Sequence, residues 1–185
     1  MARLPEAAEV CIRNAGRGDL AVLIALRQSV GWSSGGIEGS FALVDAGRQA
    51  ILLAEINGRV VGSVAMSFQV PASGGFRSGH ISDLLVAPLW RRRGVGTALL
   101  QSAERAASDR GLTQVTLDVD ASNRAALALY FGTGYTHYRP AQFPWGPGYT
   151  LRKVLVPRHQ LGSGRLLLRW WRRWSQGPWS DRARL

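Results

Sequence analysis

Apolar residues recur with a helical period near the start of the chain. From residue 19 to residue 30 they fall at spacings of three and four, which predicts an amphipathic helix with Asp19 as its N-cap. The following segment, 31–39, is rich in glycine and serine and predicts a loop. A second short helix is expected over residues 41–48.

The hydrophobic pattern then changes to runs of β-branched residues. Two such runs, 50–56 and 59–70, flank Asn57-Gly58, a dipeptide typical of a tight β-hairpin turn. We therefore expect two antiparallel strands, followed by a glycine- and serine-rich link over residues 71–79.

Strands and helices alternate in the rest of the pattern. A continuous apolar run before a proline indicates a buried strand, apolar positions four apart indicate a helix, and strict alternation indicates a strand with one buried face. The elements expected on these grounds are a strand over 80–86 that Pro88 ends, a helix over 95–110 with Gly111 as its C-cap, a strand over 114–120, a helix over 123–131 capped by Ser122, and strands near 135–139 and 149–156. This order of elements predicts an α/β (α+β) protein with a mixed central sheet.

The length and composition fit one domain with a tail. A chain of 185 residues with 46% hydrophobic residues can bury a sizeable core, and no internal repeat marks a second one. The single cysteine, Cys11, stands in an apolar run and is expected to be a small core residue. We find neither the apolar stretch of a signal peptide nor one long enough to span a membrane, so a cytoplasmic protein is expected.

Positive charge is concentrated towards the C-terminus. The formal net charge is +11, and residues 157–185 contribute +6 of it through seven arginines and Asp181. Within this tail, residues 163–174 combine tryptophan and arginine as surface-seeking helices do, which indicates contact with an anionic membrane or with nucleic acid. Packing on the domain, self-association as a homodimer, and disorder stay open as alternatives.

A basic, glycine-containing turn joins the strand at 80–86 to the helix at 95–110. It reads Arg91-Arg-Arg-Gly94-Val-Gly96. The free N–H groups at the start of a helix attract anions, and glycine lets phosphate oxygens approach the backbone closely. The turn therefore predicts a pyrophosphate site held mostly by backbone groups.

Two other nucleotide-binding interpretations of this turn fit less well. A phosphate-binding P-loop requires a Gly-Lys pair, which the chain lacks, and a dinucleotide-binding fingerprint requires a third glycine where the chain has Leu99. The two glycines could also make nothing more than a tight turn between a strand and a helix.

Two motifs in this sequence resemble the hallmarks of one known family. Residues 91–96 match the R/Q-x-x-G-x-G/A loop of the GNAT family of N-acetyltransferases at every defining position. Further along, Asn123 followed by Leu-Tyr130 and the pair Gly134-Tyr135 resembles the family's second hallmark. The resemblance covers about residues 10–156. It implies a GNAT-like sheet of six to seven strands with about four helices in a domain over 1–156.

The resemblance implies that acetyl-CoA is the co-substrate and that no metal takes part. In similar enzymes acetyl-CoA lies where two parallel strands splay apart, here residues 81–86 and 115–120. The residues implied to bind it are Leu85 and Val86 through their backbone, the pyrophosphate loop Arg91, Arg92, Arg93, Gly94, Val95 and Gly96, and Asn123 along the pantetheine arm.

The resemblance also implies a general acid, Tyr130, that protonates the leaving thiolate, since a phenol stays protonated at neutral pH. For the general base we expect Asp83, beside the thioester. Glu55 on a neighbouring strand is an alternative, and either carboxylate would accept the proton through a water molecule. His80 and His137 are more distant candidates.

The acceptor is expected to be a primary amine on a small molecule or a peptide. In similar enzymes variable segments bind it, here the loop 32–38 and the link 142–148. The second hypothesis is a catalytically idle module of the same fold that binds nucleic acid or a membrane through its basic tail.

Overall fold

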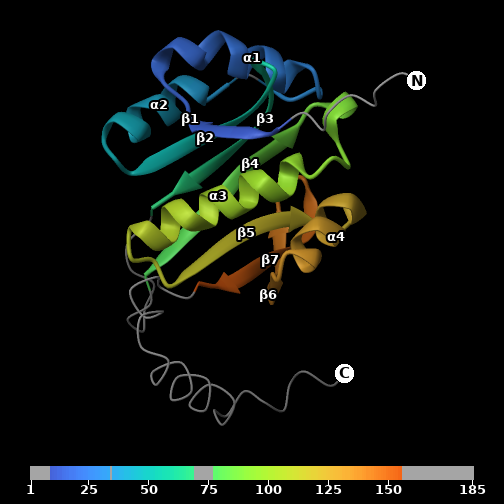
Figure 1. The fold of residues 1–185 in the computed structure, drawn as a ribbon. Helices are drawn as coiled ribbons and strands as arrows, with labels where there is room; N and C mark the ends of the chain where they lie inside the picture. Colours follow the sequence, from blue (N-terminus) through green and yellow to red (C-terminus); the bar gives the residue numbers. More distant parts are fainter. Residues whose placement is uncertain (1–8, 34, 69–76, 156–185) are drawn as a thin grey trace, which may run out of the picture.

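The computed structural model describes residues 9–33, 35–68 and 77–155 (Figure 1). The tail 157–185, with the Trp- and Arg-containing segment 163–174, lies outside the described residues, as does most of the link 71–79. The described elements are β1 (Cys11–Asn14), a 3-10 turn (Arg17–Asp19), α1 (Leu20–Gln28), α2 (Ile37–Asp45), β2 (Gln49–Ile56), β3 (Arg59–Ser67), β4 (Ser78–Val86), a 3-10 turn (Pro88–Trp90), α3 (Val95–Asp109), β5 (Gln114–Asp120), α4 (Arg124–Gly132), β6 (Thr136–Phe143) and β7 (Gly146–Val154).

The strands form one mixed sheet of seven, in the order β1-β2-β3-β4-β5-β7-β6. Neighbours are antiparallel except for the pair β4–β5, which is parallel. Helix α3 makes the crossover between these two strands, as a parallel connection requires. The expected α+β architecture with a mixed sheet is confirmed.

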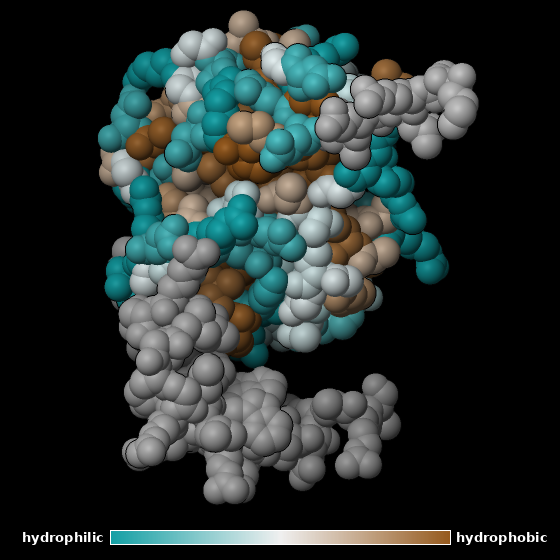
Figure 2. Space-filling model, viewed as in Figure 1, coloured by the Kyte–Doolittle hydropathy of each residue, from teal (hydrophilic) through white to brown (hydrophobic). Residues whose placement is uncertain are grey.

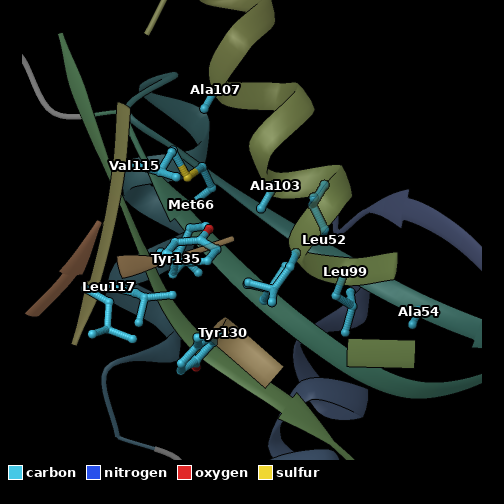
Figure 3. Close-up of a cluster of buried hydrophobic side chains, with 14 of the residues drawn as sticks. Leu52, Ala54, Met66, Leu99, Ala103, Ala107, Val115, Leu117, Tyr130 and Tyr135 are labelled. Atoms are coloured by element: carbon cyan, nitrogen blue, oxygen red, sulfur yellow. The ribbon is translucent and has the colours of Figure 1, made fainter. Parts of the chain in front are cut away.

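Helices cover both faces of the sheet. Helix α3 runs across one face, where its Leu99 and Ala103 belong to one core with Leu117 of β5, and α4 adds Tyr130 to the same core (Figures 1 and 3). Helices α1 and α2 cover the other face over β2 and β3, in a smaller core that includes Phe41. We call these the α3 face and the α1–α2 face.

Figure 2 shows hydrophilic residues over much of one side, with hydrophobic side chains exposed in separate patches. Within the described part of the chain, no helix has the length and hydrophobicity needed to cross a membrane.

The N-terminal strand β1 was not predicted, and the expectation for Cys11 was wrong. β1 has only four residues, too few for its apolar run to reveal a period, and it is held by pairing with β2 from Cys11↔Glu55 to Asn14↔Leu52. Because β1 is an edge strand, Cys11 is exposed rather than a core residue.

Two helix starts differ in detail from the predictions. Asp19 occupies the N-cap position of α1, but its carboxylate makes no capping bond to the helix and instead accepts hydrogen bonds from Arg13 and from the Gly16 N–H. At α4 the cap is Asn123, not Ser122: Asn123 Oδ1 accepts from the Ala126 N–H at 3.1 Å. Ser122 binds the carboxylate of Asp120 instead.

Two segments expected as loops contain regular structure. Helix α2 begins at Ile37, four residues before the predicted start, because Gly36 supplies a left-handed N-cap with φ 84°. The segment 142–148 belongs to the β6–β7 hairpin, which turns at Pro144 and Trp145.

The Arg13 guanidinium ties β1 to the chain that enters α1. It binds Asp19 Oδ1 at 2.7 Å and Glu55 Oε1 at 2.8 Å. The hydrogen bond to Arg13 lowers the pKa of Asp19 from 3.8 to about 2, with a smaller contribution from the Gly16 N–H. A carboxyl whose pKa is depressed in the folded state stabilises that state above its unfolded pKa, and the contribution is lost as the pH falls through the folded pKa.

We expect Asp19→Asn to lower the free energy of unfolding at pH 7 by about 1 kcal/mol, a value that allows for partial solvent screening. The difference from wild type should shrink below about pH 4 and be small near pH 2, because Asp19 is then protonated in the unfolded state and about half protonated in the folded state. Urea unfolding across this pH range measures it. Asp45→Asn, which breaks the more exposed pair with Arg17, is the control and should change stability by less. A difference as large at pH 2 as at pH 7 would contradict the assignment of the lowered pKa to Asp19.

Candidate functional site

The parallel strands β4 and β5 separate after four paired residues. Their register runs from Ser78↔Gln114 to Ile81↔Leu117 and ends there, although both strands continue. Beyond this point β4 is held by β3 and β5 by β7. The expected splay of residues 81–86 from 115–120 is thus present, and its apex lies at Ile81 and Leu117.

A β-bulge interrupts β4 just after the apex. Ser82 pairs with Ala65 and Leu85 pairs with Ser63, so Asp83 and Leu84 together face Val64. Asp83 has φ 52°, a left-handed conformation that is uncommon for a residue with a side chain. Strained backbone of this kind is concentrated at functional sites, where it re-aims a side chain.

The bulge turns Asp83 into a pocket on the α1–α2 face. The pocket has a volume of about 250 Å³, and Leu23, Ile37, Ser40 and Ser63 line it with Asp83. Arg27 of α1 also lines it and donates from Nη1 to Asp83 Oδ2 at 3.0 Å and from Nε to the Ser33 carbonyl at 2.8 Å. The sequence analysis missed Arg27, because only the folded chain brings α1 to β4.

The turn between β4 and α3 presents a row of free backbone N–H groups. Arg92 and Gly94 both have positive φ, 61° and 82°, and Gly94 is the N-cap of α3. The first bond of the helix runs from the Ala98 N–H to the Gly94 carbonyl at 2.9 Å. Among the described residues no acceptor binds the N–H groups of residues 92–97. Six successive donors at the positive end of a 15-residue helix form an anion site.

Side chains around the turn keep it open and basic. Arg91, Arg92 and Arg93 are exposed. Arg91 Nε donates to the Val86 carbonyl at 3.0 Å, which ties the turn to the end of β4. A Cβ on Gly96 would lie 3.1 Å from Leu129 Cδ2, so glycine lets the start of α3 approach α4 closely.

The main-chain groups of Leu85 and Val86 point in opposite directions. The Leu85 carbonyl faces β3, where it would be 2.8 Å from a Cβ on Gly62. Because successive residues of a strand alternate, the groups of Val86 point towards the split. The role expected for these two residues stays a prediction.

Asn123 lies at the start of α4, beyond the end of β5. Its side-chain oxygen caps α4, which leaves the side-chain NH₂ group as the donor for a ligand. Its predicted contact with the arm of the co-substrate therefore concerns this NH₂ group.

Tyr130 is buried at the margin of the main core (Figure 3). Its ring centroid lies 5.9 Å from that of Tyr135. Burial disfavours the phenolate and raises the pKa of Tyr130 from 10.0 to about 12. The hydroxyl therefore stays protonated over the whole physiological range, as its expected role requires.

The alternative bases lie in different places. Glu55 pairs with Arg13 near the β1 edge, two strands away from β4. His137 lies on the α3 face between Phe131 and Tyr149, at ring distances of 4.9 and 4.7 Å. His80 lies on the α1–α2 face next to the apex of the split. The described residues contain no group of three or more His, Cys, Asp or Glu side chains that could hold a metal ion.

The sequence matches the model of a known family. Residues 28–135 match the acetyltransferase (GNAT) family, and this span is more than half of the chain. It contains α2 to α4 and therefore the split strands, the anion-binding turn and Tyr130.

Individual proteins are similar over parts of the chain. The acetyl transferase GW6a of Oryza sativa subsp. japonica is 31% identical over 110 residues, which are 56% of this chain and 26% of the rice protein. The N-alpha-acetyltransferase of Sulfurisphaera tokodaii is 30% identical over 117 residues, 58% of this chain and 69% of that relative. The chain thus matches only about a quarter of the rice protein's length.

Solved structures share the fold. The paia N-acetyltransferase of Thermoplasma acidophilum, in complex with coenzyme A, superposes with a TM-score of 0.67 and covers 79% of this chain and 99% of its own. The two sequences are 17% identical, so the likeness concerns the fold alone.

The left-handed conformation of Gly94 leads to a stability prediction. Gly94→Ala should destabilise the protein by about 1 kcal/mol, because a side chain at φ 82° is strained although no atom lies within 4 Å. Gly132→Ala is the matched control: its Cβ would also be free, its φ is ordinary, and alanine favours the helix, so stability should rise slightly. Urea unfolding compares the two, and equal effects would contradict the role of φ.

Proposed function

Because this chain belongs to the GNAT family of acetyltransferases, we propose that it transfers the acetyl group of acetyl-CoA directly to a primary amine. The observation that carries the proposal is the row of free N–H groups at residues 92–97, next to the split between β4 and β5. Such a turn suits the pyrophosphate of coenzyme A, and an open strand edge suits its amide-containing arm.

The chain's own residues divide into groups along this ligand. Arg91, Arg92 and Arg93, with the backbone of Gly94, Val95 and Gly96, hold the pyrophosphate. The main-chain groups of Val86 on β4, which point towards the split, bind the arm and polarise the thioester, and Asn123 donates to the arm from its side-chain NH₂ group. When bound, acetyl-CoA supplies an activated acetyl group.

Asp83 and Tyr130 are the side chains proposed to touch the reacting groups. Asp83 attracts the ammonium group of the acceptor towards the pocket of about 250 Å³, and the ion pair with Arg27 holds its carboxylate in place. Tyr130 donates a hydrogen bond to the sulfur as negative charge develops on it. A pocket of this size fits a small amine or the first residue of a peptide.

A peptide α-amine is the first acceptor to test. The support is the Sulfurisphaera tokodaii relative, whose name describes an N-alpha-acetyltransferase. A tripeptide of alanine and ethylamine together represent the peptide and small-amine classes, and the release of the coenzyme A thiol reports transfer to either.

The cofactor site is tested by calorimetric titration with coenzyme A and acetyl-CoA. The wild type should bind both, and Gly94→Glu should weaken binding by at least about 100-fold, because it adds a carboxylate where the phosphates would lie. Gly94→Ala imposes the same backbone strain without the charge, and its affinity for the two ligands should fall less than about 10-fold. The comparison of these two variants separates charge repulsion of the phosphates from an effect of backbone strain on folding.

The absence of any binding by folded wild-type protein would contradict the proposed enzyme. It would favour the second hypothesis, an idle module of the same fold that acts through its basic tail. Binding that Gly94→Glu leaves unchanged would instead move the cofactor away from this turn.

The role of Tyr130 is tested by Tyr130→Phe. We expect kcat to fall about 100-fold with little change in coenzyme A binding, because only the hydroxyl is lost. Since the pKa of Tyr130 is raised to about 12, deprotonation of its hydroxyl should cause no loss of wild-type activity below about pH 11. Tyr135→Phe, in the adjacent buried ring, is the control and should stay within about twofold. An equal loss in both variants would indicate a packing effect.

A further inference from the structure

A chain of polar side chains crosses β4, β5 and β7 on the α1–α2 face. His80 Nδ1 lies 3.2 Å from Thr116 Oγ1, and His80 Nε2 lies 4.0 Å from Asp118 Oδ2. Thr150 Oγ1 donates to the other carboxylate oxygen, Asp118 Oδ1, at 2.7 Å. The functions described above use none of these four side chains.

The contacts around Thr116 point to one tautomer of His80. The Thr116 hydroxyl has one hydrogen and lies within hydrogen-bond distance of the Gly79 carbonyl, at 3.3 Å, and of His80 Nδ1. Donation of that hydrogen to the carbonyl makes the hydroxyl oxygen the acceptor towards His80 and Nδ1 the N–H donor. In the neutral ring Nε2 then keeps a free lone pair, and this nitrogen is the one that faces Asp118.

The gap between His80 Nε2 and Asp118 Oδ2 suits a bound N–H group. At 4.0 Å the two acceptors are too far apart for a direct hydrogen bond, and a donor placed between them could bond to both. Both side chains are one-third exposed, so the gap is open to a ligand. Thr150 holds the carboxylate in place from the β7 side.

The gap lies at the apex of the split. His80 pairs with Thr116, one step before the last paired residues, and Asp118 is the first residue of β5 after β4 has separated. A ligand whose phosphates lie on the turn at 92–97 and whose arm follows β4 would bring its far end towards this apex. The gap therefore faces the end of the arm rather than the phosphates.

We infer that His80 and Asp118 receive the ammonium group of the acceptor in this gap and that His80 Nε2 is the base that takes its proton. The inference rests on the proposed acetyl transfer. One proton passes from the ammonium to Nε2, and the free amine then forms the C–N bond to the acetyl carbon. The C–S bond breaks with its electron pair on sulfur, which takes a proton from Tyr130. The proton lost by the new amide restores Tyr130, and His80 releases its proton to water.

Asp83 is less suited to this step than His80. Its Oδ2 already accepts a hydrogen bond from Arg27 at 3.0 Å, so this oxygen is not free to take the proton of the acceptor. The charged group that faces His80 is Asp118 of β5. Arg152 of β7 pairs with Thr116 and stacks on Tyr138, Asp83 further along β4 is bound by Arg27, and the β3 partner of His80, Ser67, is neutral. Asp83 guides the ammonium group, and His80 removes the proton.

The tautomer can be measured without any acceptor. Nitrogen NMR of the wild type at pH 8 should show the Nδ1–H form of His80, with the signal assigned by its loss in His80→Gln. In Thr116→Val the acceptor for Nδ1–H is removed, and the preference for this form should disappear. An Nε2–H form of His80 in the wild type would overturn the inference whatever the activity.

The catalytic step is tested by the pH profile of kcat, with trialanine or ethylamine, whichever the wild type acetylates faster. A base that must be neutral gives a rate that rises with pH between about 5 and 8. In His80→Gln the rise of kcat with pH should disappear, and kcat should be about 100-fold lower than in the wild type. Coenzyme A binding, measured by calorimetry, should stay the same. Asp118→Asn should mainly raise KM for the amine.

His137→Gln is the matched control, because His137 pairs with Leu151 and so lies on the opposite face of the sheet from Asp118. It should keep both the rate and the rise of kcat with pH. A folded, coenzyme-binding His80→Gln that keeps this rise would overturn the inference and leave the proposed function standing. A wild type that binds no coenzyme A and acetylates neither amine would contradict both the inference about His80 and the proposed function.

Discussion

Main-chain hydrogen bonding between β4 and β5 is the constraint on which the rest of the site depends. A buried backbone N–H or carbonyl without a partner is costly, so sheets rarely leave two neighbouring strands unpaired in the middle. Here pairing stops at Ile81↔Leu117 in the centre of a seven-stranded sheet. The groups beyond it must bind water or a ligand, and the free N–H groups at the start of α3 lie at the same end of β4.

The two strands stay apart because each is fixed by its other neighbour. β4 stays paired with β3 on both sides of the bulge, and β5 remains paired with β7 as far as Asp120↔Gly148. At Gly148 a Cβ would lie 2.3 Å from the Val119 carbonyl, so only glycine allows β7 to follow β5 this closely. The split is therefore a built part of the sheet rather than a frayed end.

Local patterns predicted the elements well, and contacts distant in sequence account for most of what was missed. The hairpin at Asn57-Gly58, the helix over 95–109 and the glycines of the basic turn all leave a signature within a few residues. The bulge at Asp83 leaves none, because it is defined by the register with β3. The same holds for Arg27, which reaches Asp83 across 56 positions, and for the partners of His80 on β5.

The raised pKa of Tyr130 limits how this residue could assist a leaving thiolate. An ordinary thiol has a pKa of about 8.5, so complete transfer from a phenol of pKa about 12 is uphill by about 5 kcal/mol. A hydrogen bond that tightens as the C–S bond breaks has no such cost, and it stabilises the charge where it develops. Burial strengthens that bond because few waters compete for the hydroxyl. The position of Tyr130 in the core therefore favours donation of a hydrogen bond first, with proton transfer completed when the new amide gives up its own proton.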